Sequence, residues 1–224
     1  MKLILFDIDG TLLSAGGAGT KSLELAFRDL FSIDNAFTGI GMAGKTDVQI
    51  IKEGLAAHNL ESKNGAIPEL IDLYLGHLRN EMNNDRKHLK PGISTALKRL
   101  KQERDYPLGL LTGNLEEGAR IKLGIFDLNL YFASGAFGSD DEDRNRLLPI
   151  AVKRFKEISG LEISFRDCII VGDTPRDVFC AKPYGAFCIG VATGPYPSSE
   201  LVKAGADIVF ENLMDTDAFM NAIK

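Results

Sequence analysis

The sequence opens with Leu3-Ile4-Leu5-Phe6-Asp7-Ile8-Asp9-Gly10-Thr11, which joins a run of four apolar residues to a short acidic turn. A continuous apolar run of this length is typical of a strand that is buried on both faces in a parallel sheet. The same order, an apolar run followed by a polar turn, recurs at 107–114 and at 168–174. We therefore predict a parallel sheet whose strands end in polar turns.

A fourth apolar run at 187–191 and a weaker one at 208–210 add strand candidates, and helical stretches such as 115–123 and 147–158 separate the runs. Strands that alternate with helices indicate βαβ units. The fold class that we predict is α/β, with a Rossmann-like parallel-sheet core in three α/β/α layers.

The region from about residue 15 to residue 88 breaks this rhythm and carries no strong strand signal. Its apolar residues recur at helical spacing, as in Leu23, Ala26, Phe27 and Leu30. Glycines at 16–19 and the turn at 90–92 flank it as candidate hinges. We predict a helical-bundle cap domain at 15–88, inserted into a core domain formed by 1–14 and 89–224.

Composition narrows the classes of function. The chain has 224 residues, a net charge of -5 and three cysteines without a CxxC pair. The acidic balance lacks the basic footprint of nucleic-acid binding, and no apolar stretch approaches the roughly 18 residues of a membrane span. We expect a cytoplasmic protein with reduced, buried thiols, a monomer or homodimer, that binds neither nucleic acid nor membranes.

The carboxyl ends of parallel strands meet at one edge of the sheet, where ligands bind. This edge should gather the polar residues of the three turns, namely Asp7, Asp9, Thr112, Asn114, Asp173 and Asp177. A set of oxygen ligands favours a hard ion such as Mg²⁺. None of the three histidines lies at a predicted strand end, so acid–base chemistry would fall to carboxylates. One carboxylate can attack phosphorus, and a second can protonate the leaving oxygen.

Three motifs together resemble the haloacid dehalogenase superfamily. Residues 7–11 look like its DxDGT motif, 111–114 look like its strand that ends in Ser or Thr, and 171–177 look like its acidic GDxxxD motif. Their order and spacing match over essentially the whole chain. The helical insertion after the first motif resembles the C1 cap class, and the overall pattern is similar to the phosphoglycolate phosphatase-like branch.

The resemblance implies roles for the acidic residues. Asp7 would be the nucleophile and a magnesium ligand. Asp9 would be the general acid/base, with its backbone carbonyl on the metal, and Asp173 would complete the protein's share of the ligands. Asp177 would orient the site. A carboxylate at Asp9 favours phosphoryl transfer, because the dehalogenases of the superfamily lack one there.

The remaining roles concern the phosphate. The resemblance implies that Thr112, with the amides of Gly113 and Asn114, holds the phosphoryl oxygens, and backbone amides at the start of a helix favour an anion on physical grounds too. The family usually has a lysine ahead of the acidic motif, and the matching stretch 143–149 has none. Arg144 aligns best with it, Arg146 is the alternate, and Lys153 is a distant third. An arginine can also neutralise phosphate and an aspartate.

The glycine-rich stretch 39–47 has two interpretations. It could be a substrate-specificity loop of the cap, in which Lys45 meets a substrate carboxylate. It could instead be an exposed loop before a helix at 48–55, with Thr46 or Asp47 as the N-cap.

The resemblance implies a Mg²⁺-dependent phosphatase that hydrolyses a small phosphorylated metabolite, phosphoglycolate-like or a sugar phosphate, through an aspartyl-phosphate. One alternative is a phosphomutase of the β-phosphoglucomutase type, which returns the phosphoryl group to the substrate. A phosphonate hydrolase would need a Schiff-base lysine from the cap, for which Lys45 is a distant candidate. A third alternative is a phosphate-binding regulator without turnover.

Overall fold

The computed structural model describes residues 1–103 and 105–224, and its main element in these residues is a sheet of six parallel strands. They are β1 (Leu3–Phe6), β4 (Leu108–Leu111), β5 (Ser134–Ala136), β6 (Cys168–Gly172), β7 (Phe187–Val191) and β8 (Ile208–Phe210). Across the sheet they lie in the order β5-β4-β1-β6-β7-β8. Numbered along the chain this order is 3-2-1-4-5-6, the doubly wound arrangement of the Rossmann fold. The predicted α/β fold with a Rossmann-like core is therefore confirmed.

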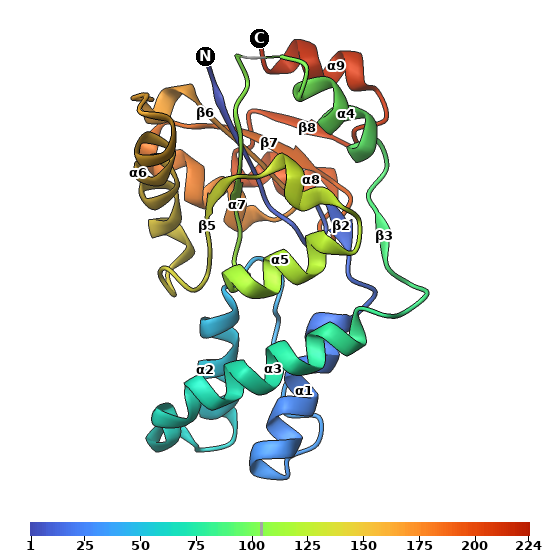
Figure 1. Cartoon of the computed structure of the whole chain (residues 1–224), viewed down its shortest axis with the longest axis vertical. Coiled ribbons are helices and arrows are strands. Elements are labelled where there is room, and N and C mark those ends of the chain that lie inside the picture. The colour runs from blue at the N-terminus through green and yellow to red at the C-terminus, as the bar shows by residue number, and fades with distance from the viewer. Residues whose placement is uncertain (104) are drawn as a thin grey trace.

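Helices cover both faces of this sheet (Figure 1). The helices of the core are α4 (Ile93–Leu100), α5 (Glu116–Gly124), α6 (Leu147–Ser159), α7 (Pro175–Ala181), α8 (Ser198–Ala204) and α9 (Thr216–Ala222). Short 3-10 turns add η1 (Glu61–Ala66), η2 (Leu128–Tyr131), η3 (Arg144–Arg146), η4 (Phe165–Asp167) and η5 (Lys182–Tyr184).

Alternate side chains of β1 belong to two different apolar clusters. Ile4 and Phe6 pack in the cluster that includes residues of α4, α5 and α9. Leu3 and Leu5 pack in the cluster that includes residues of α6 and α7. Successive residues of a strand point to opposite faces of its sheet, so β1 is buried on both faces. This is the three-layer arrangement that the continuous apolar run predicts.

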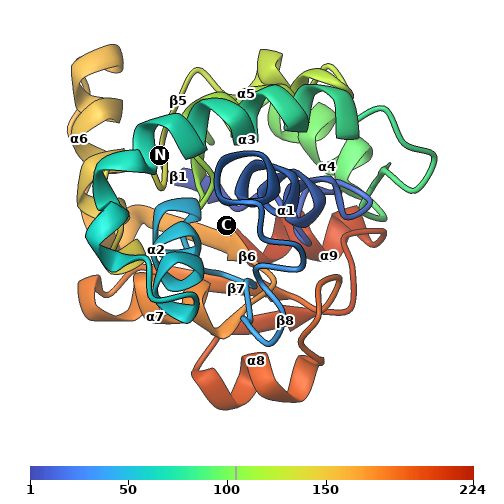
Figure 2. The ribbon, with the colours of Figure 1, turned by 90° about the horizontal axis from the view of Figure 1, so that it is seen from below.

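The insertion consists of α1 (Ala18–Phe31), α2 (Asp47–Ala57) and α3 (Ile67–Glu81), which gather at the end of the molecule away from the chain termini (Figure 1). Seen from below, α3 runs alongside α1 (Figure 2). A short antiparallel pair, β2 (Leu13–Ser14) with β3 (His88–Leu89), joins this helical group to the core. The helical periodicity of the insertion was therefore a correct guide to its secondary structure.

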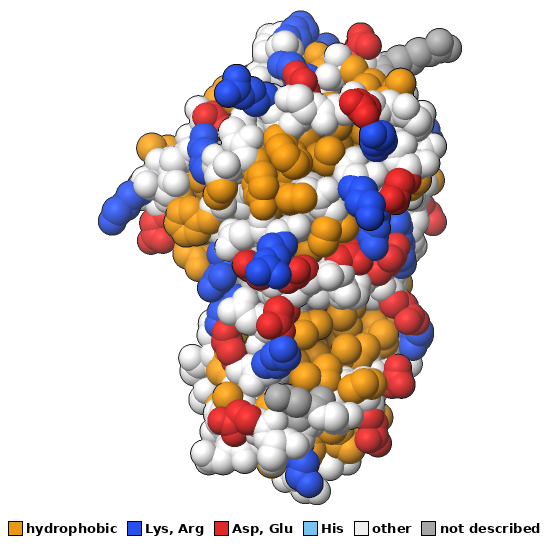
Figure 3. Space-filling view, turned by 90° about the vertical axis from the view of Figure 1, so that its left-hand side faces the viewer, with side chains coloured by type: hydrophobic (Ala, Val, Ile, Leu, Met, Phe, Trp, Pro, Cys, Tyr) orange, Lys and Arg blue, Asp and Glu red, His pale blue; other side chains and the backbone are white. Residues whose placement is uncertain are grey.

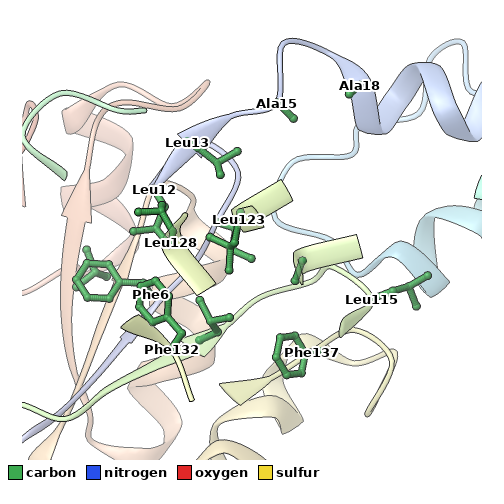
Figure 4. Close-up of a cluster of buried hydrophobic side chains, with 14 of the residues drawn as sticks. Phe6, Leu12, Leu13, Ala15, Ala18, Leu115, Leu123, Leu128, Phe132 and Phe137 are labelled. Atoms are coloured by element: carbon green, nitrogen blue, oxygen red, sulfur yellow. The ribbon is translucent and has the colours of Figure 1, made fainter. Parts of the chain in front are cut away.

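Apolar packing is continuous between the sheet and the insertion. Figure 4 shows part of the larger cluster, which runs from Phe6 on β1 to Ala18 at the start of α1. The rings of Phe6 and Phe132 meet edge to face with their centroids 6.0 Å apart. Because Leu13 and Ala15 carry the cluster into the helices, the insertion is packed against the core rather than held only by its two connections.

The surface carries mixed charge. On the face shown in Figure 3, basic and acidic side chains intermingle, also where the sheet-containing part meets the helices of the insertion. One such pair, Lys52 with Glu142, links α2 to the loop before η3. Across the described ranges, no helix combines the length and the apolar character needed to cross a membrane. The three cysteines are free and buried.

Candidate active site

A cavity of about 430 Å³ lies between the carboxyl ends of the central strands and the inserted helices. The core side of its wall includes Asp7, Asp9, Gly113, Asn114, Lys122, Arg144 and Asp173. The insertion contributes Thr20, Leu23, Met42, Lys45, Asp47, Ile50 and Tyr74. The sheet therefore brings together most of the polar residues that follow the predicted strands, under a roof made by the insertion.

Asp7 follows β1 directly, and its amide donates to the carbonyl of Val171 on β6 at 2.9 Å. Its carboxylate Oδ1 lies 3.2 Å from Nη2 of Arg144. The same Nη2 forms a hydrogen bond with the carboxylate of Asp177. All three side chains are buried, so one guanidinium compensates two carboxylates in a site of low polarity.

Burial raises the pKa of Asp7 to about 6. The positive charge of Arg144 opposes this shift, whereas the charges of Asp177 and Asp9 add to it. A carboxylate that is desolvated among other acids is unstable as an anion until positive charge reaches it. The electrostatic environment of Asp7 therefore favours additional positive charge near its carboxylate.

Asp173 has an unused ligand atom. Its Oδ1 accepts from the hydroxyl of Thr11 at 2.9 Å, but its buried Oδ2 has no hydrogen-bond partner among the described residues. Burial and the nearby charge of Asp7 raise the pKa of Asp173 well above its usual value. Gly10 and Gly194 approach it so closely that a Cβ on either would lie 2.2 Å and 1.6 Å from Oδ2. A buried, unpaired carboxylate oxygen needs an external partner.

Asp177 is occupied in a different way. It forms a capping box at the start of α7, in which its Oδ2 accepts from the amide and the hydroxyl of Thr174. Its Oδ1 receives Arg144. Asp7, Asp173 and Asp177 each place one oxygen within 4.8 Å of the others. Both oxygens of Asp177 have partners, whereas Asp173 keeps a buried oxygen without one and Asp7 lines the cavity, so Asp7 and Asp173 are the acids that best fit a hard cation such as Mg²⁺.

The turn after β4 closes another wall of the cavity. Gly113 and Asn114 line it, while Thr112 is fully buried behind them and accepts from the side-chain amide of Asn114 at 2.8 Å. The carbonyl of Gly113 accepts from the amide of Asp47 in the insertion at 2.8 Å. A Cβ at Gly113 would lie 2.1 Å from the carbonyl oxygen of Lys45, so this glycine allows the insertion to approach.

Lys122 is a site residue that the sequence did not reveal. Its Nζ lies 2.5 Å from Oδ2 of Asp9 and 2.5 Å from Oδ1 of Asn114. Burial disfavours its charged form, but Asp9 and Asp47 outweigh burial and raise the pKa of Lys122. The only signal in the sequence is a lysine at helical spacing among buried residues, since Ala119 and Leu123 share its buried face of α5.

The two arginines of the stretch 143–149 separate clearly. Arg144 lies in the site, whereas the side chain of Arg146 is 70% exposed and faces Asp141 and Asp143. The structure therefore does not bring Arg146 to the cavity. Lys153 is also exposed, on α6.

Lys45 lines the cavity and forms an ion pair with Glu53 of α2. The stretch 39–47 thus contributes to the cavity wall. Thr46 is the N-cap of α2, as one of the two interpretations predicts, because its hydroxyl accepts from the amide of Gln49. The N-cap of the second interpretation is confirmed, and a role of Lys45 toward a substrate stays a prediction.

This α/β fold, with acidic turns at the strand ends under an inserted helical roof, defines a hydrolase of the haloacid dehalogenase type. A family model described as haloacid dehalogenase-like hydrolase matches residues 1–185, and the chain belongs to this family.

Relatives by sequence extend over nearly the whole chain. A Clostridium perfringens protein provisionally named as the pyrophosphatase PpaX is 24% identical over 96% of this chain and 95% of its own. The phosphoglycolate phosphatase of Vibrio vulnificus is 26% identical over 95% of this chain and 93% of its own. Together with the family, such relatives support a phosphatase.

Solved structures share the fold. A hydrolase from Pseudomonas syringae has a TM-score of 0.78 with 20% identity and covers 100% of this chain and 99% of its own. CbbY from Rhodobacter sphaeroides, solved in complex with phosphate, has a TM-score of 0.75 with 16% identity and covers 96% of both chains.

Proposed function

We propose that the protein is a magnesium-dependent phosphatase that hydrolyses a small phosphorylated metabolite through an aspartyl-phosphate on Asp7. The observation that carries the proposal is the buried carboxylate of Asp7, which lines the cavity and lies 3.2 Å from Arg144. We further propose that residues 15–88 act as a cap domain over a core formed by 1–14 and 89–224.

In the first step, an oxygen of Asp7 attacks phosphorus, and the bond from phosphorus to the leaving oxygen breaks as the new bond forms. Asp9 gives a proton to the leaving oxygen. Arg144, which Asp177 holds in place, offsets the charge of Asp7 and of the transferring phosphoryl group. The amides of Gly113 and Asn114 bind the phosphoryl oxygens, and Thr112, buried behind them, supports the turn through its hydrogen bond with Asn114.

In the second step, water attacks phosphorus and the bond to Asp7 breaks, which releases inorganic phosphate. Asp9 now accepts the proton of the water. Asp7, Asp173 and the backbone carbonyl of Asp9 would hold Mg²⁺, which when bound supplies positive charge against the phosphate. The insertion limits access of bulk water to the cavity and must open for turnover.

A cavity of about 430 Å³ suits a small substrate. Its roof mixes apolar side chains such as Met42 and Ile50 with Lys45 and Tyr74. We propose a phosphoglycolate-like compound or a sugar phosphate. A substrate carboxylate would have to compete with Glu53 for Lys45, so the two classes should differ in their sensitivity to Lys45→Met.

Hydrolysis of a phosphate-ester panel with and without Mg²⁺ tests the proposal. We expect the purified protein to release phosphate only with the metal, and Asp7→Asn, which keeps the shape of the side chain, to be inactive. Retained activity in this variant would exclude Asp7 as the nucleophile. Analysis of the products separates release of phosphate from its return to a hexose phosphate, which would indicate a mutase.

A further inference from the structure

Two donors hold a single oxygen of the Asp9 carboxylate. Nζ of Lys122 lies 2.5 Å from Oδ2, and the side-chain amide of Asn114 donates to the same Oδ2 at 3.0 Å. In the described part of the chain, no hydrogen bond reaches the other oxygen, Oδ1, although Asp9 lines the cavity. The carboxylate is therefore fixed on one side and open on the other.

Lys122 is itself held firmly. Its side chain is only 5% exposed, and its Nζ also donates to Oδ1 of Asn114 at 2.5 Å. Asn114 in turn donates to Thr112 at 2.8 Å, so both donors on Asp9 are anchored in the turn after β4 or in the helix that follows it. A side chain whose partners are locked by further hydrogen bonds is preorganised.

The insertion contributes to the same arrangement. Asp47, at the start of α2, lies close enough to Lys122 for the two charges to interact. Oδ2 of Asp47 accepts from the amide of Leu115 at 2.9 Å and from the hydroxyl of Tyr74 at 3.4 Å. Lys122 thus lies between an acid of the core and an acid of the insertion, at the place where the insertion meets the core.

We propose that Lys122 is a positioning residue for Asp9: it holds Oδ2 so that Oδ1 faces the leaving oxygen of the substrate. This inference rests on the proposed function, in which Asp9 protonates that oxygen. The bond between Lys122 and Asp9 forms across the cavity wall, from α5 to the turn after β1, so it fixes the proton donor relative to the phosphate-binding turn.

If Lys122 positions Asp9, the effect of replacing Lys122 on the hydrolysis rate should depend on the leaving group of the substrate. A phenolate needs its proton as the bond to phosphorus breaks, whereas a dinitrophenolate is stable without one. General acid catalysis typically contributes about 10²–10⁴-fold. Loss of a residue that positions the acid should therefore lower kcat/KM for phenyl phosphate far more than kcat/KM for dinitrophenyl phosphate. A residue that only neutralises the phosphoryl group, or only supports the fold, should slow both equally.

The experiment compares kcat and KM of both esters for the wild type, Lys122→Met, Lys122→Arg and Asp9→Asn. Because both esters form the same aspartyl-phosphate, the leaving group affects kcat/KM, which reports the steps up to transfer of the phosphoryl group to Asp7. We expect Lys122→Met to lower kcat/KM about 10²-fold for phenyl phosphate and less than about tenfold for dinitrophenyl phosphate. Asp9→Asn should show the same dependence on the leaving group, and Lys122→Arg, which keeps a charged donor, should recover part of the lost kcat/KM. Circular dichroism checks the fold, and Lys122→Gln replaces Lys122→Met if the latter does not fold.

Arg120→Met is the matched control on the same helix. Arg120 donates to the carbonyl of Phe132 at 2.8 Å and does not line the cavity, so its loss should affect both esters alike. Equal losses of kcat/KM for both esters in the Lys122 variants, or no loss, would overturn the inference alone. If the wild type hydrolyses neither these two esters nor any member of the phosphate-ester panel, the proposed function fails, and this inference fails with it.

Discussion

Arg144 shows how one residue can serve several partners in a small space. One of its terminal nitrogens, Nη2, meets Asp7 and Asp177, and the other, Nη1, donates to the carbonyl of Gly44 in the insertion at 3.1 Å. A lysine offers one nitrogen and a point charge, whereas the guanidinium is a planar fork. The arginine thus connects two acids of the core with the backbone of the roof.

Replacement of Arg144 should separate its charge from its shape. Arg144→Met leaves Asp7 and Asp177 buried without compensation, so we expect loss of activity and a free energy of unfolding lower by about 3–5 kcal/mol. Arg144→Lys keeps the charge but cannot reach all three partners, and we expect about a tenfold lower kcat/KM. Urea unfolding and kinetics with one phosphate ester measure both effects.

Arg146→Met is the natural comparison for these variants. In the described structure, the exposed side chain of Arg146 forms ion pairs only with acids of its own loop. The free energy of unfolding of Arg146→Met should therefore stay within about 0.5 kcal/mol of the wild type. A larger loss of activity in Arg146→Met than in Arg144→Met would favour the alternate alignment of the missing lysine.

The sequence motifs predict the acidic residues of the candidate site more clearly than its basic residues. Asp7, Asp9 and Asp173 follow strands whose apolar runs are unmistakable, so their meeting place follows from parallel-sheet geometry alone. Arg144 and Arg146 share a 3-10 turn, and which of them points inward depends on its contact with Asp177. Lys122 contacts Asp9 from helix α5, and no sequence motif around Lys122 predicts this contact.

At the scale of elements, the turn after β4 is a place where the roof and the core meet closely. The amide of Asp47 donates to the carbonyl of Gly113, and the carboxylate of Asp47 accepts from the amide of Leu115 near the start of α5. Thr46 adds a hydrogen bond from its hydroxyl to the carbonyl of Glu142 at 2.8 Å. The roof therefore binds the backbone of the turn after β4 directly.

Gly113→Ala should disturb this junction. Its Cβ would lie 2.1 Å from the carbonyl oxygen of Lys45, and the clash is relieved most easily by displacement of the roof. Because small displacements in a closed site can cost about 10²-fold, we expect a loss of that order in kcat/KM with the core fold intact. Small-angle scattering and limited proteolysis should report a more open molecule.

Gly118→Ala in α5 is the matched control, because the added Cβ would meet only ordinary contacts at 3.5 Å or more. Alanine in a helix interior is more stable than glycine by about 0.5–1 kcal/mol, so stability should rise slightly and activity should not change. Normal activity and an unchanged scattering profile in Gly113→Ala would contradict a tightly seated roof.

The apolar runs in the sequence predicted the central strands correctly. They did not predict the edge strand β5, which is held by close backbone packing and has no apolar run. β5 has the sequence Ser134-Gly135-Ala136, which carries no apolar run and was not predicted. It lies at the edge of the sheet, and a Cβ at Gly135 would lie 2.7 Å from Cβ of Leu110 on β4. Its position depends on this close approach, which local propensity does not encode.

At the scale of the whole molecule, the cluster of acids opposes folding unless positive charge joins it. Three carboxylates each place one oxygen within 4.8 Å of the others, and one buried guanidinium forms ion pairs with two of them. A ligand that binds only the folded state stabilises it by about 2.7 kcal/mol at one hundred times its Kd. We expect Mg²⁺ to raise the unfolding temperature and a chelator to reverse the effect.

Two variants sharpen this measurement. Asp173→Asn removes one of the repelling charges, so without metal it should be at least as stable as the wild type, and Mg²⁺ should no longer stabilise it. Asp217→Asn, an exposed acid on α9, should keep the full response to the metal. A response that is unchanged in Asp173→Asn would place the ion elsewhere.

The overall layout followed from the alternation of strands and helices, and the insertion was visible as a break in that alternation. The way in which the insertion packs on the core could not be predicted from the sequence, because the contacts join residues far apart in the chain, such as Asp47 and Leu115. Hydrogen bonds to backbone groups leave little trace in side-chain patterns, so this part of the structure could not be predicted.

The pairing of β2 with β3 brings the two ends of the insertion together. Ser14 and His88 lie opposite each other, so everything between them leaves and re-enters the core at one point, as a hairpin loop does. The entropy of closing such a loop grows only with the logarithm of its length, about 0.6 kcal/mol for each doubling. A change in the length of the insertion would therefore add little to the entropic cost of closing the chain at Ser14 and His88, so the sheet could tolerate a longer or shorter segment at this point.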